Sequence, residues 1–182
     1  MFGKDTRGVQ AVRLEVVPQA LERLKRGNTF INNLQRLKNH WTSRRVKFNE
    51  GVTEKSIAAF ECQYGVVLPT DLRDFFLTVN GMPDDITDEE MIRFWRLEEV
   101  KPLSSEAREF AKPDYIENSQ SLFVFADYSL WAHAYVIRLD GRKCDKNEIF
   151  LIGGDYPVLL FRSFSELVDS YLADPFRMFG MR

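Results

Sequence analysis

The stretch from Gly51 to Gly81 constrains the fold of this chain more than any other part of the sequence. It reads GVTEKSIAAFECQYGVVLPTDLRDFFLTVNG, which is two short amphipathic segments joined by a Leu-Pro hinge. The apolar side chains of the first segment recur with helical spacing at Ile57, Phe60 and Tyr64. Thr53 can cap this segment, and Gly65 suits the left-handed turn that ends a helix. The pattern therefore predicts a helix between Thr53 and Gly65.

The second segment repeats this design after the hinge. Pro69 disfavours helical angles at Leu68, so a new helix is expected from Thr70, whose hydroxyl would cap it. Its apolar side chains share one helical face: Leu72, Phe75, Phe76 and Val79. Asn80-Gly81 is expected to stop the helix. Burying one large apolar side chain contributes roughly 1.5–3 kcal/mol, so the two helical faces together predict the centre of a core.

Beyond Gly81 the pattern changes from helical to extended. Strands are predicted over 91–97, 122–126, 131–139, 148–152 and 157–161, and a short helix over 104–111. Ser163 and Glu166 form an S-x-x-E capping box that opens a closing amphipathic helix, which Pro175 ends. Helices first, then hairpin-linked strands, then a last helix predict an α+β fold with a mainly antiparallel central sheet.

Charge divides the chain into two unequal parts. Residues 1–50 carry eleven Lys or Arg against four Asp or Glu, whereas residues 51–182 carry 14 against 23. The first part is interpreted as a basic, largely helical extension over 1–49, in which a short strand is one reading of residues 1–17. A helix is expected from Pro18, with an interruption at Gly27-Asn28. A further helix, capped by Thr29, has one apolar face: Phe30, Leu34, Leu37 and Trp41.

The charge asymmetry has two explanations. The extension is either a basic arm for an external partner or an arm that packs against its own acidic domain. We favour the second explanation, because a tethered partner has a high effective concentration. The predicted domain spans 50–175, and a short tail spans 176–182.

The acidic segment after Gly81 is a candidate site. Five carboxylates fall within seven residues: Asp84, Asp85, Asp88, Glu89 and Glu90. Their spacing differs from that of an EF-hand loop and includes no glycine for the turn, so no metal is expected. A solvated loop and an acidic surface for a basic partner both fit this segment, since complementary charge speeds association.

The sequence offers little material for catalysis. Asp127, Ser129 and His133 suggest a triad, but Ser129 and His133 on one extended strand would lie roughly 13 Å apart. A satisfied strand histidine is expected instead. Cys62 is interpreted as a small core residue, and Glu61 as a structural acceptor for a backbone N–H. No catalytic residue and no cofactor are predicted.

Cellular location is inferred from what the sequence lacks. Two cysteines do not make a disulfide framework, and residues 1–10 lack the apolar centre of a signal peptide. No apolar run approaches the roughly 18 residues that span a bilayer. A cytoplasmic protein without membrane contact is therefore expected.

The order of motifs in the predicted domain resembles the SUKH superfamily, which includes fungal cell-wall-assembly regulators and many bacterial toxin-immunity proteins. Matching residues in the helical stretch are Ile57, Phe60, Glu61, Tyr64, Gly65, Leu68, Pro69, Asp71, Phe75-Phe76-Leu77, Asn80 and Gly81. Later matches are Phe94-Trp95, Leu97-Glu98-Glu99, Phe125-Ala126-Asp127 and Phe161-Arg162-Ser163-Phe164. The resemblance covers about residues 50–172 and implies a SUKH-like fold in which these motif residues are structural.

The resemblance also implies a function. It points to a non-catalytic immunity protein that neutralises a cognate toxin by docking, and such toxins include nucleases and others that act on nucleic acid. The acidic surface that would meet a basic cleft comprises Asp84, Asp85, Asp88, Glu89, Glu90, Glu98 and Glu99. A regulatory or scaffolding module is an alternative. The less favoured alternative is nucleic-acid binding through the basic arm, which has no recognition motif: Arg23, Lys25, Arg26, Arg36, Lys38, Arg44, Arg45 and Lys47.

Overall fold

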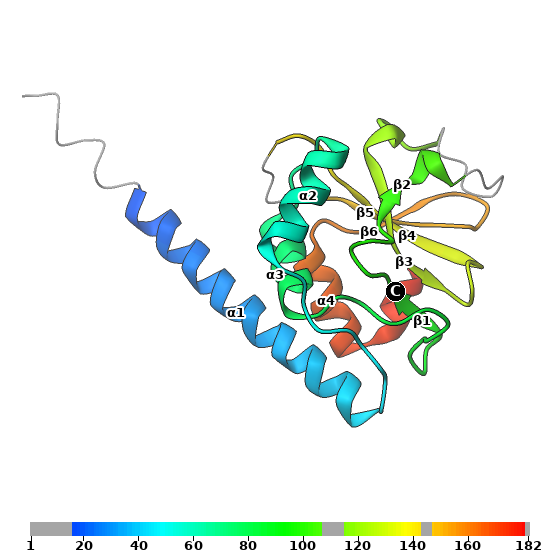
Figure 1. The fold of residues 1–182 in the computed structure, drawn as a ribbon, viewed down its shortest axis with the longest axis horizontal. Coiled ribbons are helices and arrows are strands. Elements are labelled where there is room, and N and C mark those ends of the chain that lie inside the picture. The colour runs from blue at the N-terminus through cyan, green and yellow to red at the C-terminus, as the bar shows by residue number, and fades with distance from the viewer. Residues whose placement is uncertain (1–15, 107–114, 143–146, 181–182) are drawn as a thin grey trace, which may run out of the picture.

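A computed structural model of the chain describes residues 16–106, 115–142 and 147–180, with side chains from Phe30 onward. Within these residues, four α-helices pack on one face of an antiparallel six-stranded sheet (Figure 1). The helices are α1 (Val16–Ser43), α2 (Glu54–Tyr64), α3 (Thr70–Thr78) and α4 (Phe164–Ala173). The strands are β1 (Ile92–Phe94), β2 (Lys101–Pro102), β3 (Leu122–Tyr128), β4 (His133–Arg138), β5 (Ile149–Ile152) and β6 (Val158–Phe161). The predicted α+β fold is confirmed.

The two helices of the central stretch form as predicted, with one correction at a cap. Thr53 Oγ1 accepts a hydrogen bond from the Ser56 N–H, and Gly65 ends α2 in the left-handed region at φ 66°. Thr70, however, is the first residue of α3 and not its cap. The cap position belongs to Pro69, which has no side chain that can accept a hydrogen bond. Asp71 instead accepts from the Ser165 N–H, which ties α3 to the first turn of α4.

From Val16 to Ser43 the extension forms one continuous helix, so the predicted interruption at Gly27-Asn28 is wrong. A glycine costs about 1 kcal/mol inside a helix, which a 28-residue helix can absorb. The predicted apolar face of α1 is buried: Phe30, Leu34, Leu37 and Trp41. Trp41 also donates its indole N–H to the Tyr171 hydroxyl of α4 at 3.0 Å. The second half of α1 is therefore part of the core.

The sheet has the order β1-β3-β4-β5-β6, and β2 pairs with β3 beyond the end of β1. β3 is buried on both faces, as expected of a central strand. On β4, Tyr135 and Ile137 point into the helix-side core, whereas Ala134 and Val136 join a smaller cluster on the other face. Trp95 and Leu103 cover part of that second face.

Two predicted strands are shorter than expected. β1 ends at Phe94, and a turn follows in which Arg96 accepts from the Glu99 N–H. β4 begins at His133, because Ser129–Trp131 form the tip of a hairpin. At both places an acidic side chain accepts from a backbone N–H: Glu99 from that of Arg96, and Asp127 from that of Trp131. These bonds close turns where extended strand was predicted.

The ends of the chain add smaller elements. The capping box forms in part: Ser163 accepts from the Glu166 N–H, but the Glu166 carboxylate accepts from the Arg162 N–H and not from that of Ser163. A 3₁₀ turn over Pro175–Phe179 follows α4 and buries Met178 in the core. Of the helix expected over 104–111, a 3₁₀ turn forms at Leu103–Ser105 and residues 107–114 lie outside the described residues. The strand considered within 1–17 also lies outside them, except for residues 16–17 in α1.

None of the helices in the described part of the chain combines the length and the apolar character that crossing a bilayer would need.

Candidate protein-docking surface

The acidic loop, residues 83–91, connects the region after α3 to β1. Its carboxylates do not form one continuous exposed face. Asp84, Asp85 and Glu89 are exposed, but Asp88 is only 6% exposed. Asp88 accepts from the Tyr171 hydroxyl at 2.5 Å and from the Ile92 N–H at 2.7 Å. Burial raises the pKa of Asp88 even though these two bonds favour its ionised form. Asp88 therefore fixes the loop to the core and is not exposed to a partner.

The basic end of α1 lies against this acidic loop. Arg44 reaches Glu90 at 2.9 Å and Glu89 at 3.3 Å. Nearby, the Lys38 ammonium lies 5.7 Å from the centre of the Phe48 ring. The two Arg44 ion pairs are of the intramolecular kind that the charge asymmetry suggested. They also occupy part of the basic arm that nucleic acid would need.

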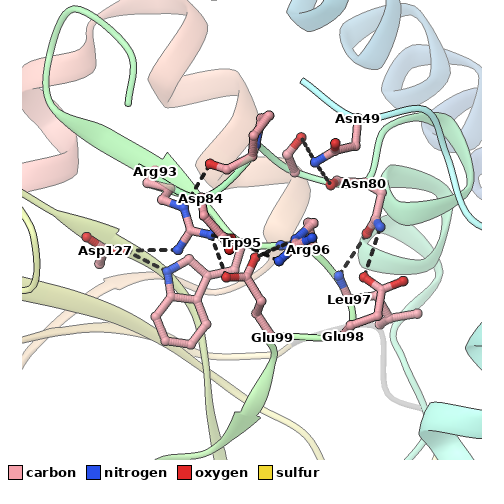
Figure 2. A network of polar contacts seen from close by, with 12 residues as sticks. Asn49, Asn80, Asp84, Arg93, Trp95, Arg96, Leu97, Glu98, Glu99 and Asp127 are labelled. Carbon is pink, nitrogen blue, oxygen red and sulfur yellow. Dashed lines mark hydrogen bonds and ion pairs between the residues drawn. The ribbon is translucent and has the colours of Figure 1, made fainter. Parts of the chain in front are cut away.

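A network centred on Arg93 joins the loop to the turn after β1 (Figure 2). Arg93 binds Asp84 at 3.0 Å and Glu99 at 2.5 Å. Arg96 contacts the same two carboxylates at 2.9 and 3.1 Å. Burial alone would raise the pKa of Glu99, but the hydrogen bonds from Arg93 and Arg96 hold it below the usual range. Asp84 and Glu99 are therefore held in fixed positions.

Asn80 and Gly81 position the other side of this turn. Asn80 Oδ1 accepts from the Leu97 N–H at 2.8 Å, and its Nδ2 donates to Glu98 at 3.0 Å. A Cβ on Gly81 would lie 2.3 Å from the Trp95 carbonyl oxygen, so only glycine allows this close approach. Glu98 and Glu99 thus lie in a turn after β1.

Asp127 connects the Arg93 network to the β3–β4 hairpin. It accepts from the Trp95 indole N–H at 2.6 Å and from the Trp131 backbone N–H at 3.2 Å. Arg93 approaches the same carboxylate at 4.0 Å. The Trp95 and Trp131 rings pack edge to face with centres 5.1 Å apart. These contacts hold the hairpin tip in place.

Left-handed backbone gathers at this end of the sheet. Of the seven non-glycine residues with positive φ in the described ranges, five lie in the acidic loop and the hairpin tip: Asp85, Met91, Ser129, Leu130 and Trp131. The Ser129 N–H donates to the Met91 carbonyl at 2.9 Å and so joins the two loops. Backbone in such conformations is strained and is concentrated at functional sites in proteins.

The strained hairpin tip presents an apolar side chain to solvent. Leu130 is 78% exposed, and Met91 beside it is 46% exposed. We call the group Asp84, Asp85, Glu89, Met91 and Leu130 the docking surface. Protein interfaces combine an apolar centre with a polar rim, and this group offers both. Met91 and Leu130 were not among the candidates predicted from the sequence. The only indication in the sequence was that Leu130 is an apolar residue between two predicted strands.

Other sequence-based candidates have different surroundings from those expected. Cys62 is exposed on α2 and is not a core residue. Ser129 lies in the turn and not on a strand. The buried Nδ1 of His133 has no hydrogen-bond partner among the described residues, which differs from the satisfied strand histidine that was expected. The role predicted for Glu61 is confirmed, since it accepts from the Leu68 N–H at 2.9 Å. No group of His, Cys, Asp and Glu within the described ranges could hold a metal ion.

Comparison with known proteins places these motifs in a family. The family model described as the SMI1/KNR4 family (SUKH-1) matches residues 51–170. A search of curated proteins finds no significant match. The matched region includes α2, α3, the whole sheet and most of α4, and therefore the acidic loop and the hairpin tip. The chain belongs to the SMI1/KNR4 family (SUKH-1), as the resemblance of its motifs to the SUKH superfamily indicated.

Proposed function

We propose that this chain is a non-catalytic, cytoplasmic immunity protein that neutralises a cognate bacterial toxin by docking on it. The observation that carries the proposal is the exposed pair Met91 and Leu130 beside the carboxylates of Asp84, Asp85 and Glu89. Membership of the family supports a domain of this superfamily, and the immunity role is our inference.

Backbone strain at the hairpin tip supports a role in binding. A left-handed conformation costs roughly 1–2 kcal/mol at each non-glycine residue, and the hairpin tip has three in succession. The left-handed backbone by itself would favour glycine or asparagine at these positions. Contacts with Asp127 and Trp95 hold the tip in one conformation, so Leu130 is presented with little ordering cost on binding. A rigid apolar anchor of this kind is what an interface centre requires.

The carboxylates around this anchor indicate the partner's charge. Asp85 has no hydrogen bond or ion pair within the described residues, and Asp84 and Glu89 remain exposed although arginines contact them. A basic surface would satisfy these groups, and charge complementarity would speed its association. A toxin that acts on nucleic acid would carry such a surface.

The test is co-expression with any toxin-like protein found to be encoded beside this chain. We expect the native chain to restore growth and to bind an inactivated toxin, and Leu130→Asp combined with Asp85→Lys to abolish both. Leu159→Asp is the matched control, because Leu159 is an apolar residue, 42% exposed, on β6. If the folded Leu130→Asp/Asp85→Lys variant protected as well as the native chain, the docking surface would be wrong.

Two other outcomes would favour the alternatives. A stable complex with a host protein, together with no toxin encoded nearby, would indicate a regulatory or scaffolding module. Binding to duplex or single-stranded nucleic acid that weakens steeply with salt would indicate the basic arm. Because Arg44 is engaged by Glu89 and Glu90, we expect no such binding at low salt.

A further inference from the structure

A shallow depression of about 330 Å³ lies between α2 and the turn that follows β1. Its apolar lining comes from Ala59, Phe60, Tyr64, Leu97 and Val100, and Glu98 lies at its rim. This volume is at the low end for small-molecule sites, which are about 300–1,000 Å³. The depression therefore suits one long side chain better than a cofactor.

One wall of the depression is aromatic and held by ring contacts. The Phe60 and Tyr64 rings have centres 4.9 Å apart, and Tyr64 packs edge to face on Phe123 at 5.4 Å. No Lys or Arg is among the lining residues. Such a wall can take the aliphatic part of a Lys or Arg side chain and attract its charge.

Glu98 supplies an acceptor that its surroundings orient. Its Oε2 accepts from Asn80 Nδ2 at 3.0 Å, and Asn80 is 6% exposed and also binds the Leu97 N–H. Oε1 has no hydrogen-bond partner within the described residues. The buried Asn80 thus fixes the Glu98 carboxylate (Figure 2). Glu98 is one of the residues that line the depression, and its second oxygen is left to accept a donor.

We propose that this depression receives a single Lys or Arg side chain of a protein partner, with its stem on Phe60 and Tyr64 and its cationic head at Glu98. A cationic head adds the attraction between opposite charges to its hydrogen bond with the Glu98 carboxylate, so a basic side chain is preferred over an amide. The inference rests on the proposed protein-binding function and deepens it, because it names the partner's chemistry at a second point. Glu98 lies in the same turn as Arg96, which contacts Asp84 at 2.9 Å, so one partner can contact both carboxylates (Figure 2).

The experiment uses a small probe and the full chain, without the partner. Nα-acetyl-arginine amide is titrated into ¹⁵N-labelled protein, and its neutral analogue Nα-acetyl-citrulline amide is titrated in parallel. We expect the arginine probe to cause saturable shifts of the Ala59, Gln63 and Glu98 amide signals at millimolar concentration. The citrulline analogue is expected to bind at least about tenfold more weakly.

Two variants and one control test the site. Glu98→Gln removes the charge, and Ala59→Trp fills the depression from the exposed face of α2, so each is expected to abolish the saturable shifts. Glu54→Gln, on the same helix but paired with Arg73, is expected to bind the probe as the native chain does. Absence of saturable shifts, equal binding by Glu98→Gln, or shifts confined to the acidic loop would each overturn the proposal.

The outcome separates this inference from the proposed function. Probe binding at Glu98 combined with unaffected protection by the Leu130→Asp/Asp85→Lys variant would retain the depression and reject the docking surface. Loss of protection in that variant without probe binding would reject the depression alone.

Discussion

The indole N–H of Trp95 donates to the carboxylate of Asp127 over 2.6 Å, and this bond joins the segment after β1 to strand β3. Trp95 follows β1, whereas Asp127 lies near the end of β3 and also accepts from the Trp131 N–H. Asp127 is 3% exposed. If its carboxylate were removed, water could not easily reach the two N–H donors to replace it as acceptor. This bond therefore determines the position of the hairpin tip.

Asp127→Ala is expected to destabilise the fold by about 2–4 kcal/mol, because two donors lose their acceptor. Chemical denaturation would measure this loss, and amide hydrogen exchange at Trp131 should become faster. Lys55→Ala is the control, since this exposed residue on α2 should change stability by about 0.5 kcal/mol or less. A loss below about 1 kcal/mol for Asp127→Ala would contradict the assigned role.

Leu130→Gly should separate stability from binding. Glycine adopts φ 53° without strain, so the free energy of unfolding is expected to stay level or rise by up to about 1 kcal/mol. Affinity for the partner is expected to fall at least tenfold, because the apolar anchor is lost. Denaturation and calorimetric titration measure the two effects. Leu130→Met is the control that keeps the anchor, and unchanged affinity in Leu130→Gly would exclude Leu130 from the interface.

Gly65 and Gly81 form a matched pair for testing close packing. Both have left-handed backbone, at φ 66° and 59°, but a Cβ on Gly65 would meet nothing within 4 Å. Gly65→Ala is expected to cost about 1–2 kcal/mol, and Gly81→Ala about 3–4 kcal/mol because its Cβ would collide with the Trp95 carbonyl. Thermal and chemical unfolding would compare them. Equal losses would show that the backbone near Trp95 can move away.

Glu99→Gln should reveal a pH-dependent contribution. The pKa of Glu99 is lower in the folded chain than its usual value of 4.5, so the ionised carboxylate stabilises the fold above that pH. This contribution is lost as the pH falls through the folded pKa. We expect Glu99→Gln to lose about 1–2 kcal/mol around neutral pH and to approach the native chain below pH 4.5. Denaturation curves across this range provide the test, and a pH-independent difference would contradict it.

Much of the fold follows from local patterns in the sequence. The apolar spacing of α2 and α3, the Gly65 turn and the Ser163 cap of α4 all depend on neighbouring residues, and each forms as predicted. The continuity of α1 could not be predicted in this way. Gly27-Asn28 disfavours a helix locally, but the packing of Leu34 and Trp41 against distant elements stabilises the segment that follows.

The candidate site was predictable only in part. The carboxylates of the acidic loop can be read from the sequence, but the sequence does not indicate which of them is buried. Asp88 is buried because it binds Tyr171, which is 83 residues away in the chain. The apolar anchor was missed because Leu130 owes its position to the register of β3 and β4 and to Asp127. Such contacts between distant residues have no local pattern.

The first half of α1 has a mechanical consequence. It extends away from the rest of the molecule, whereas the half from Phe30 onward packs into the core (Figure 1). At about 1.5 Å per residue, Val16 stands roughly 20 Å along the helix axis from Phe30. The helix can therefore act as a stiff spacer, setting both the distance and the direction at which anything attached before Val16 meets a neighbouring molecule.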